Sequence, residues 1–346
     1  MIKLLVPDMP TADDLLPYLR RIDAARIYVN NGPLVQKLQA RLEQMTGAHV
    51  ALVSNGTVAL ELALKAATED SVTEEYDGLG FDHNEVLMPA LTFSATGLAA
   101  LNAGLVPRLT DCDRRTWQMR APEIRKPHVV AAIQVATFGM PAETHQWNWY
   151  HVPVIIDAAG AFPSQEVSKD PNIATCFSLH ATKFIGCGEG GFVASANKER
   201  IERIRSLSSF GEDGTNAKMS EYHAAVALAS LDRLSEKRMR AERIEWWYKE
   251  MGGRLDLRCG GHTIMNVMLP IPAAEVIPKM LAAGIETKQW YRPYLDERDE
   301  FSIPRGKFPV TDHLREHLLG IPFHNLITSE EVSHVCATLK NVLRSD

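Results

Sequence analysis

The sequence is poor in cysteine, and its cysteines are widely separated. Five occur among the 346 residues, and no two form a CxxC motif. Scattered cysteines are typical of free thiols in a reducing compartment, and they offer no ligand set for a metal ion. We therefore expect a cytoplasmic protein that binds no metal. The five positions are Cys112, Cys176, Cys187, Cys259 and Cys336.

Long apolar runs and an excess of positive charge are also missing. No stretch approaches the roughly 20 apolar residues that span a bilayer, and residues 1–8 turn acidic too soon for a signal peptide. The formal net charge is -6, which disfavours the broad basic surface of a nucleic-acid-binding protein. We therefore expect neither a membrane nor a nucleic acid as a partner.

Several catalytic motifs are absent. The sequence contains no GxxxxGK[ST], no GxSxG and no HExxH, so nucleotide hydrolases, α/β-hydrolases and zinc peptidases are not supported. The glycines at 186–191 resemble a dinucleotide fingerprint, but an apolar strand follows them where a helix would have to begin. This context argues against a nicotinamide-dependent oxidoreductase.

Apolar runs alternate with segments of helical periodicity in the first two thirds of the chain. This alternation predicts a mainly parallel sheet with helices on both faces, whose strand ends would meet at one ligand-binding edge. The predicted strands are 50–53, 85–89, 107–110, 129–135, 154–157 and 192–195, and the predicted helices are 12–27, 33–46, 57–67 and one from 92.

A long helix predicted over 221–249 leads out of this part. The remainder mixes a strand at 263–269 with helices at 273–283 and 329–343. The fold class is therefore α/β, with a large domain over residues 1–235 and a smaller α+β domain over 236–346.

The most informative stretch places Lys183 in a loop of small residues after an apolar strand that ends at Asp157. A pyridoxal phosphate site needs a lysine that forms a Schiff base and a carboxylate that keeps the pyridine nitrogen protonated. Partial burial would lower the pKa of Lys183 towards the neutral amine that attacks an aldehyde. The alternatives are that Asp157 caps a helix and that Lys183 faces solvent.

Three further features would suit the same site. Residues 54–58 form a strand-to-helix turn whose free amides would bind a phosphate, unless Ser54 or Thr57 caps the helix. Ser178 would add a hydroxyl, or would do no more than cap a turn. Phe93 would stack on a pyridine ring, although a lone phenylalanine more often belongs to a core.

Taken in order, these segments resemble the DegT/DnrJ/EryC1/StrS family of fold-type I aminotransferases, which use pyridoxal 5'-phosphate and act mostly on nucleotide-linked keto sugars. The similarity extends over nearly the whole chain. The matching segments are NGPLV at 31–35, SNGTVAL at 54–60, PALTFSAT at 89–96, FGMP at 138–141, DAA at 157–159, SLHATK at 178–183, GEGG at 188–191 and GTNAKMSE at 214–221.

The resemblance implies a role for each matched side chain. Lys183 would form the Schiff base, and Asp157 would contact the pyridine nitrogen. Asn216 matches an asparagine that the neighbouring subunit brings to the cofactor phosphate, which implies a homodimer with shared active sites. The positions matched to the phosphate and the ring are Gly56, Thr57, Val58, Phe93 and Ser178.

One position departs from the family pattern. Three residues after the aspartate the family has Gln or His near the cofactor's ring face and phenolic oxygen, and here the residue is Gly160. Either another side chain, for which His180 is a candidate, supplies that contact, or the pocket is wider.

The implied reaction has two stages. L-glutamate would leave its amino group on the cofactor as pyridoxamine phosphate, which would then aminate a ketone. The short region before residue 30 is similar to that of compact members that aminate dTDP-linked 4-keto-6-deoxyhexoses at C4. The candidate substrate-binding residues are His180, Lys218, Arg292 and His324.

Three rival functions stay open. Amination at C3 or of a cyclitol ketone uses the same chemistry. A regulator that binds pyridoxal phosphate without turnover would use the same cofactor. A nicotinamide oxidoreductase would carry no covalent cofactor on Lys183.

Overall fold

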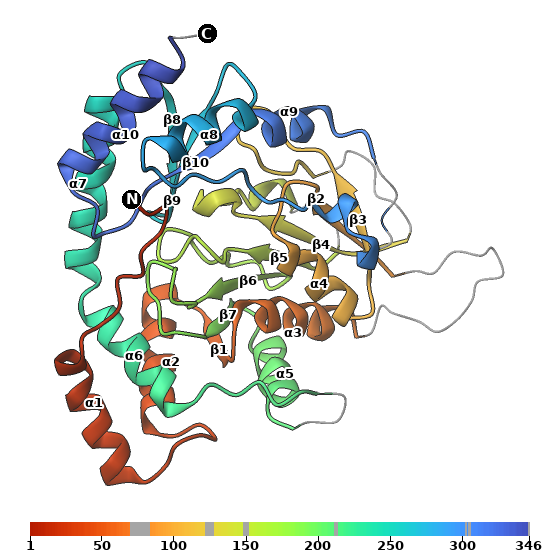
Figure 1. Ribbon diagram of the computed structural model, residues 1–346. Coiled ribbons are helices and arrows are strands. Elements are labelled where there is room, and N and C mark those ends of the chain that lie inside the picture. The colour runs from red at the N-terminus through yellow and green to blue at the C-terminus, as the bar shows by residue number, and fades with distance from the viewer. Residues whose placement is uncertain are drawn as a thin grey trace.

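A seven-stranded sheet occupies the centre of the molecule (Figure 1). The computed structural model describes residues 1–69, 84–121, 128–147, 152–210, 214–301, 303 and 306–344. In these ranges the strand order is β1-β7-β6-β5-β4-β2-β3, and β7 alone is antiparallel to its neighbours. The predicted mainly parallel sheet is therefore confirmed. The strands are β1 (His49–Val53), β2 (Glu85–Pro89), β3 (Val106–Thr110), β4 (Val129–Val135), β5 (Val154–Asp157), β6 (Ile173–Ser178) and β7 (Gly191–Ser195).

The sheet separates two hydrophobic cores. Ile155 packs into the core shared with α3, α4 and α5, whereas the next residue, Ile156, packs into the core shared with α1, α2 and α6. Because both faces are covered, the central strands β4 to β7 are buried along their whole length, whereas the edge strand β3 is partly exposed. The helices are α1 (Ala12–Ala25), α2 (Pro33–Thr46), α3 (Gly56–Thr68), α4 (Ser94–Asn102), α5 (Lys198–Ser208) and α6 (Glu221–Asp232).

A smaller antiparallel sheet follows, in the order β10-β9-β8. The chain's beginning joins it, because the Ile2 amide donates to the Gly284 carbonyl at 2.7 Å and the Phe323 amide donates to the Leu4 carbonyl at 3.1 Å. Figure 1 shows the amino terminus beside this sheet. Its elements are α7 (Leu234–Gly252), β8 (Asp256–Gly260), β9 (Ile264–Met268), α8 (Ala273–Ala282), α9 (Pro309–His317), β10 (Leu318–Ile321) and α10 (Ser329–Val342).

The single helix predicted over 221–249 is wrong. The chain forms α6 and α7 there, separated at Arg233, whose backbone leaves the α-helical region with ψ of 6°. The predicted domain boundary between residues 235 and 236 falls in the first turn of α7, and it stays a prediction. All five cysteines are free, as predicted.

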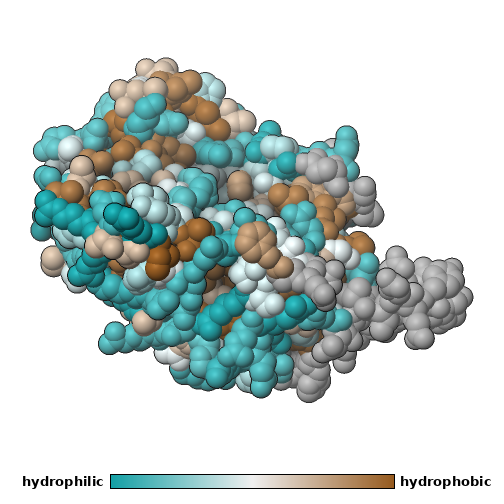
Figure 2. All heavy atoms as spheres, turned by 90° about the horizontal axis from the view of Figure 1, so that it is seen from below, coloured by the Kyte–Doolittle hydropathy of each residue, from teal (hydrophilic) through white to brown (hydrophobic). Residues whose placement is uncertain are grey.

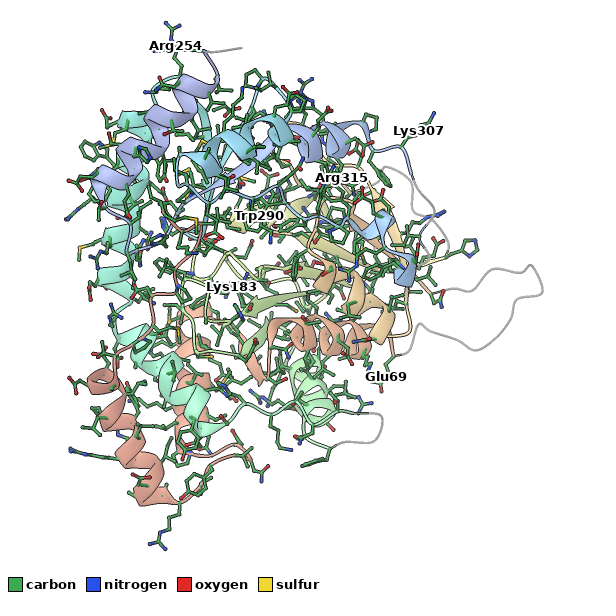
Figure 3. The ribbon with its side chains drawn as sticks, in the orientation of Figure 1. Glu69, Lys183, Arg254, Trp290, Lys307 and Arg315 are labelled. Carbon is green, nitrogen blue, oxygen red and sulfur yellow. The ribbon has the colours of Figure 1, made fainter. Side chains whose placement is uncertain are left out.

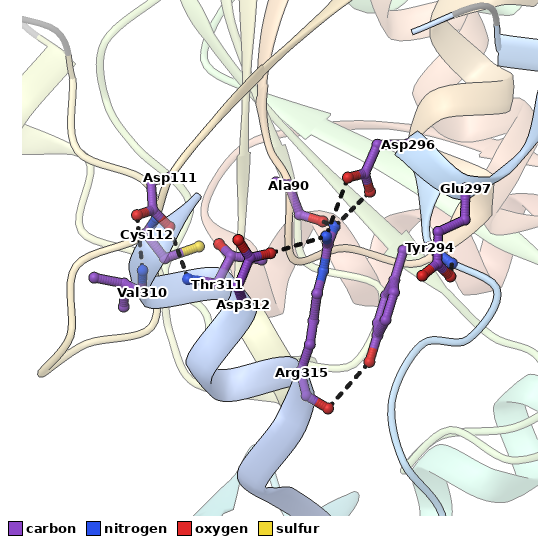
Figure 4. A network of polar contacts seen from close by, with 10 residues as sticks. All are labelled: Ala90, Asp111, Cys112, Tyr294, Asp296, Glu297, Val310, Thr311, Asp312 and Arg315. Atoms are coloured by element: carbon purple, nitrogen blue, oxygen red, sulfur yellow. Dashed lines mark hydrogen bonds and ion pairs between the residues drawn. The ribbon is translucent and has the colours of Figure 1, made fainter. Parts of the chain in front are cut away.

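A buried arginine joins the C-terminal part to the large sheet (Figure 4). Arg315 forms an ion pair with Asp296 at 2.8 Å, and the two side chains are only 9% and 8% exposed. It also donates to the Ala90 carbonyl at 2.9 Å, directly after β2, and covers the Tyr294 ring at 4.2 Å. A second carboxylate, that of Asp312, lies 3.4 Å away but is 56% exposed.

Replacing Arg315 with methionine is expected to destabilise the protein by about 3–5 kcal/mol, because it leaves the Asp296 carboxylate buried without its cation. Asp312→Ala removes the exposed partner of the same arginine and should cost less than about 1 kcal/mol. Chemical denaturation of the two variants beside the parent measures both values. Equal losses would show that burial does not distinguish the two ion pairs.

Candidate active site

The Asp157 side chain lies at the carboxyl end of β5, between the parallel strands β4 and β6. It is 7% exposed. One carboxylate oxygen accepts a hydrogen bond from the Thr96 hydroxyl at 2.8 Å, and the other accepts from the Ala159 amide at 3.2 Å. Thr96 is itself hydrogen-bonded to the Thr92 hydroxyl at 2.7 Å. These contacts fix the orientation of a buried carboxylate at the edge where ligands bind in such sheets.

Lys183 and Asp157 perturb one another. Burial raises the pKa of Asp157, while the hydrogen bonds from Thr96 and Ala159 and the charge of Lys183 lower it. Burial lowers the pKa of Lys183, and the Asp157 carboxylate raises it. No ion pair holds Asp157 among the described residues. The site therefore contains a carboxylate poised for a cation and a lysine shifted towards its neutral form. Figure 3 shows Lys183 in the interior of the molecule.

The loop that carries Lys183 is a tight excursion between β6 and β7. The Lys183 amide donates to the His180 carbonyl at 2.8 Å, and the Ala181 amide donates to the Gly188 carbonyl at the same distance. A Cβ at Gly186 would lie 2.7 Å from the Ala181 carbonyl oxygen. The glycines near the lysine thus allow two segments of the loop backbone to pack directly against each other. Strand β7 follows these glycines, as predicted.

A cradle for a phosphate lies where α3 begins. A Cβ on Gly56 would stand 2.8 Å from the Ser178 Cβ, so the first turn of the helix directly faces that serine. Asn55 is the N-cap and accepts from the Val58 amide at 2.9 Å, so the alternative of a cap by Ser54 or Thr57 is wrong. The amides of Gly56 and Thr57 are the first-turn donors left for an anion, whereas the predicted Val58 amide is engaged by Asn55.

Phe93 is the N-cap residue of α4 and is 57% exposed. The Phe93 ring packs edge-to-face with the Tyr291 ring, with 5.9 Å between the ring centres. The Tyr291 ring stacks on the Phe138 ring, with 5.3 Å between their centres. Burial, with the nearby Asp157 carboxylate, raises the pKa of Tyr291, which therefore stays protonated and able to donate. Tyr291 was not predicted from the sequence, because only the packing of a C-terminal loop brings it to the large sheet.

His324 is the substrate-binding candidate that reaches Lys183. Both line a small cavity of about 30 Å³, together with Thr182, Thr263 and Asn325. The Nδ1 atom of His324 is buried and has no hydrogen-bond partner in the structure. The lysine loop also contains His180, whose ring is hydrogen-bonded to the Thr182 hydroxyl at 2.8 Å.

The structure does not bring Lys218, Arg292 or Asn216 to Lys183 within one chain. Lys218 lines a separate cavity of about 460 Å³ and lies 3.3 Å from the centre of the Phe210 ring. Arg292 lines a third cavity beside Tyr294. Asn216 is exposed after α5, and within the described ranges its backbone forms a bridge with Ser209, away from Lys183 and Asp157.

The space beside Gly160 is filled by the smaller sheet. The Thr263 hydroxyl, in the turn between β8 and β9, donates to the Gly160 carbonyl at 3.1 Å. A Cβ on Gly139 would lie 2.6 Å from the same carbonyl oxygen, and one on Gly261 would lie 2.5 Å from it. Backbone therefore packs on backbone here, and Thr263 is a site residue that the sequence analysis missed.

The residues present fit pyridoxal phosphate. Asp157 offers a buried carboxylate to a protonated ring nitrogen, and Lys183 offers an amine whose pKa is lowered by burial. The Gly56 and Ser178 cradle suits the phosphate, and Phe93 leaves an aromatic face accessible. No group of three or more His, Cys, Asp or Glu in the described ranges is arranged to bind a metal ion. None of the described helices has the length and apolar character that crossing a bilayer requires.

The sheet, with a buried aspartate and a partly buried lysine at its carboxyl edge, defines an aminotransferase of the α/β class. The chain belongs to the DegT/DnrJ/EryC1/StrS aminotransferase family, whose sequence profile matches residues 11–340. The family resemblance noted from the sequence is thereby confirmed.

Three known proteins illustrate the similarity. A dTDP-4-amino-4,6-dideoxy-D-glucose transaminase from Shigella dysenteriae is 26% identical, with 97% of each chain covered. A UDP-N-acetyl-3-dehydro-alpha-D-glucosamine 3-aminotransferase from Acidithiobacillus ferrooxidans is 27% identical, with 99% of this chain and 97% of the relative covered. A crystal structure assigned to the PLP-dependent aminotransferases, from Bacillus cereus, has a TM-score of 0.87 at 27% identity and covers 98% of this chain and 99% of its own.

Proposed function

We propose that this aminotransferase uses pyridoxal 5'-phosphate to move an amino group from L-glutamate to the C4 ketone of a dTDP-linked 4-keto-6-deoxyhexose. The family and the named relatives support a nucleotide-linked sugar as the substrate. The observation that carries the proposal is the pair of buried Asp157 and partly buried Lys183, each of which shifts the pKa of the other, beside a phosphate site at the start of α3. A catalytically silent binding protein would not need a lysine whose pKa is lowered by burial.

Asp157 and Lys183 would have different roles in the reaction. Pyridoxal phosphate, when bound, supplies an aldehyde carbon and an electron-withdrawing ring. The Asp157 carboxylate would hold a proton at the ring nitrogen, and the hydrogen bonds from Thr96 and Ala159 keep that carboxylate oriented. The neutral amine of Lys183 would take a proton from the α-carbon of the amino donor and deliver it to the neighbouring carbon of the cofactor.

The phosphate and the ring would be held by separate elements. The first-turn amides of α3, at Gly56 and Thr57, and the Ser178 hydroxyl would bind the phosphate dianion. Phe93 would cover one face of the ring, and the Tyr291 hydroxyl, which stays protonated, would donate to an oxygen of the cofactor or substrate. Holding the cofactor at both ends fixes its reactive carbon relative to Lys183.

A homodimer with shared sites is supported by the groups that one chain leaves unused. The Lys218 ammonium is buried without a hydrogen-bond partner, and the Asn216 side chain is exposed. Figure 2 shows hydrophobic residues exposed among the hydrophilic residues of one face of the molecule. Exposed large hydrophobic residues in the segments near these groups are Ile27, Tyr28, Val29, Phe210 and Tyr222. A second copy of the chain would cover such residues and would bring Asn216 to the partner's phosphate.

The named relatives aminate different positions of the sugar ring. The Shigella relative is named for a 4-amino sugar and the Acidithiobacillus relative for a 3-amino sugar, at nearly the same identity. We favour C4 because of the resemblance noted from the sequence, and the Shigella relative, which matches over 97% of each chain, supports it. Offering the protein a 4-keto and a 3-keto sugar distinguishes amination at C4 from amination at C3.

A half-reaction followed by visible absorption tests the proposal. L-glutamate added to protein loaded with pyridoxal phosphate should bleach the yellow cofactor as it becomes pyridoxamine phosphate. After the donor is removed, a dTDP-linked 4-keto-6-deoxyglucose should restore the colour and yield a 4-amino sugar, identified by mass spectrometry and NMR. A UDP-linked 3-keto sugar serves as the matched control acceptor.

The outcomes separate the rival functions. Recovery with the 3-keto sugar alone would transfer the assignment to C3 amination. Bleaching without recovery by either sugar would keep an aminotransferase but reject nucleotide-linked hexoses of both kinds. No response to L-glutamate or to other amino acids would favour the non-catalytic binding protein.

A further inference from the structure

Lys237 is a buried lysine near the site, and the chemistry described above does not use it. It lies in the first turns of α7 and is 2% exposed. Burial lowers the pKa of Lys237, whereas the nearby Asp8 carboxylate raises it. Removing an ammonium group from water is costly unless its donors are satisfied. Its partners therefore indicate why a lysine stands at this position.

The Lys237 ammonium hydrogen-bonds to two distant parts of the backbone. It donates to the Asp8 carbonyl at 2.6 Å and to the Phe184 carbonyl at 3.2 Å. Phe184 directly follows Lys183 in the chain and is itself buried. One side chain from α7 thus fixes the peptide next to the reactive lysine and joins it to the amino-terminal segment.

The carboxylate of Asp8 completes the junction. It accepts from the Asn325 side chain at 3.1 Å and pairs with Arg233 at 3.2 Å, and the Lys237 ammonium lies 3.9 Å from it. Asp8 and Asn325 both line the small cavity that contains Lys183. The segments that meet at Lys237 are therefore walls of the space beside the reactive amine.

A second hydrogen bond holds the same loop farther along. Ser230, in α6, donates from its buried hydroxyl to the Gly186 carbonyl at 2.7 Å. Gly186 lies three residues after Lys183, whereas Phe184 adjoins it. Ser230 therefore provides a matched control, since it fastens the same loop from a neighbouring helix at a point more distant from the amine.

We propose that Lys237 is a positioning residue for Lys183, which holds the Phe184 carbonyl so that the Lys183 amine meets the cofactor's aldehyde carbon in a reactive geometry. The inference rests on the proposed function. The Phe184 peptide limits the backbone of Lys183, and a displacement of about 1 Å at a reacting group can lower a rate about 10²-fold. Asp8 supplies the charge that makes a buried ammonium tolerable.

The test measures how fast Lys183 captures the cofactor, with no sugar present. Cofactor-free protein is mixed with pyridoxal phosphate, the visible band is followed over time and pH, and borohydride reduction with peptide mass spectrometry locates the adduct. Lys237→Met keeps the shape of the side chain without its donors, and Lys237→Gln restores a donor for one carbonyl. Ser230→Ala is the control.

We expect Lys237→Met to capture the cofactor at least about 10-fold more slowly and with a shifted pH profile. Lys237→Gln should recover part of the rate, and Ser230→Ala should remain within about twofold of the parent. If Lys237→Met does not fold, the comparison of Lys237→Gln with Ser230→Ala decides.

Parent-like rates and pH profiles in both Lys237 variants would overturn the inference, as would an equal slowing in Ser230→Ala, which would assign Lys237 a general role in stability. If the parent protein itself captures no pyridoxal phosphate on Lys183, the proposed function fails, whatever the Lys237 variants do. The two failures are therefore distinct.

Discussion

Replacing Lys183 with alanine is expected to abolish transamination, by at least about 10⁴-fold, while the protein stays folded. In the proposed mechanism the amine bonds to the cofactor and moves the proton, and no other lysine of the described chain lines its cavity. Folding should not suffer, because burial lowers the pKa of Lys183 and so disfavours its charged form in the native state.

Absorption, borohydride trapping and circular dichroism together check this result. The variant should show no reduced cofactor on the protein, with parent-like secondary structure. Lys198→Ala is the control, since that lysine makes only an exposed contact with Glu202 at 3.6 Å. Turnover near the parent rate in Lys183→Ala would reject the proposed mechanism.

The same variant also tests the shared site. We expect Asn216→Ala to weaken the phosphate site of the partner subunit and lower turnover. Mixing and re-associating equal amounts of Lys183→Ala and Asn216→Ala chains should restore about a quarter of the parent activity, since half of the dimers are mixed and each contains one intact site. Activity no greater than the average of the separate variants would show that each chain builds its site alone.

The Asp157→Asn variant is expected to be inactive yet more stable without cofactor. Turnover should fall by at least about 10²-fold, because an amide cannot hold a proton at the ring nitrogen by charge. The amide still satisfies its neighbours: its oxygen can accept from Ala159, and its nitrogen can donate to Thr96, which can turn its own hydrogen towards Thr92. Losing a buried charge should then stabilise the cofactor-free protein by about 1 kcal/mol.

The pH dependence of this gain follows from the direction of the pKa shift. Burial raises the pKa of Asp157 in the folded protein, so the stability that this group contributes is present in acid and is lost as the pH rises through its folded pKa. The advantage of Asp157→Asn should therefore be small in acid and should grow towards neutral pH. Thermal unfolding of the cofactor-free proteins across that range measures it.

A contrary result has a clear meaning. Thr96→Val removes one hydrogen bond to the carboxylate and leaves the charge, so it should retain more activity than Asp157→Asn. If Asp157→Asn turns over at a near-parent rate, Asp157 serves as a structural cap. If it is less stable than the parent at neutral pH, the carboxylate contributes to folding through its hydrogen bonds alone.

Local sequence signals sufficed for six strands of the large sheet and for the centre of the site, whereas β6, which mixes Thr, Cys and Ser with apolar residues, was missed. The strand that ends at Asp157 is apolar because both of its faces are buried, and such runs are recognisable without a structure. The start of α2 was equally clear, since Pro33 stands at its first position. Lys183 stood out through the small residues on either side of it, which the tight loop requires.

The elements that were missed carry weaker local signals. Helix α5 is rich in charge, and only Ile201, Ile204 and Leu207 mark its buried side. Strand β10 begins at Leu318 directly after α9 ends, with no turn residue between them. Short elements without a clear start or stop are the ones that periodicity identifies poorly.

The rest of the site depends on contacts between distant parts of the chain. Nothing near Tyr291 in the sequence indicates that its ring will stack on Phe138. Similarly, Thr263 reaches Gly160 only because the turn of a different sheet packs there. Lys237 is one charged residue in a helix that contains many, and its burial follows from the meeting of α7 with the loop of Lys183.

The meeting of the first and last parts of the chain has a consequence for its synthesis. Val6 and Pro7 line the same cavity as Phe323 and His324. The Leu4 carbonyl accepts its hydrogen bond from the Phe323 amide. Since a ribosome releases the chain from its amino end, these early residues stay without their partners until Phe323 and His324 have emerged. A chain stopped before that point would contain Lys183 and Asp157 but lack one wall of the space around the amine.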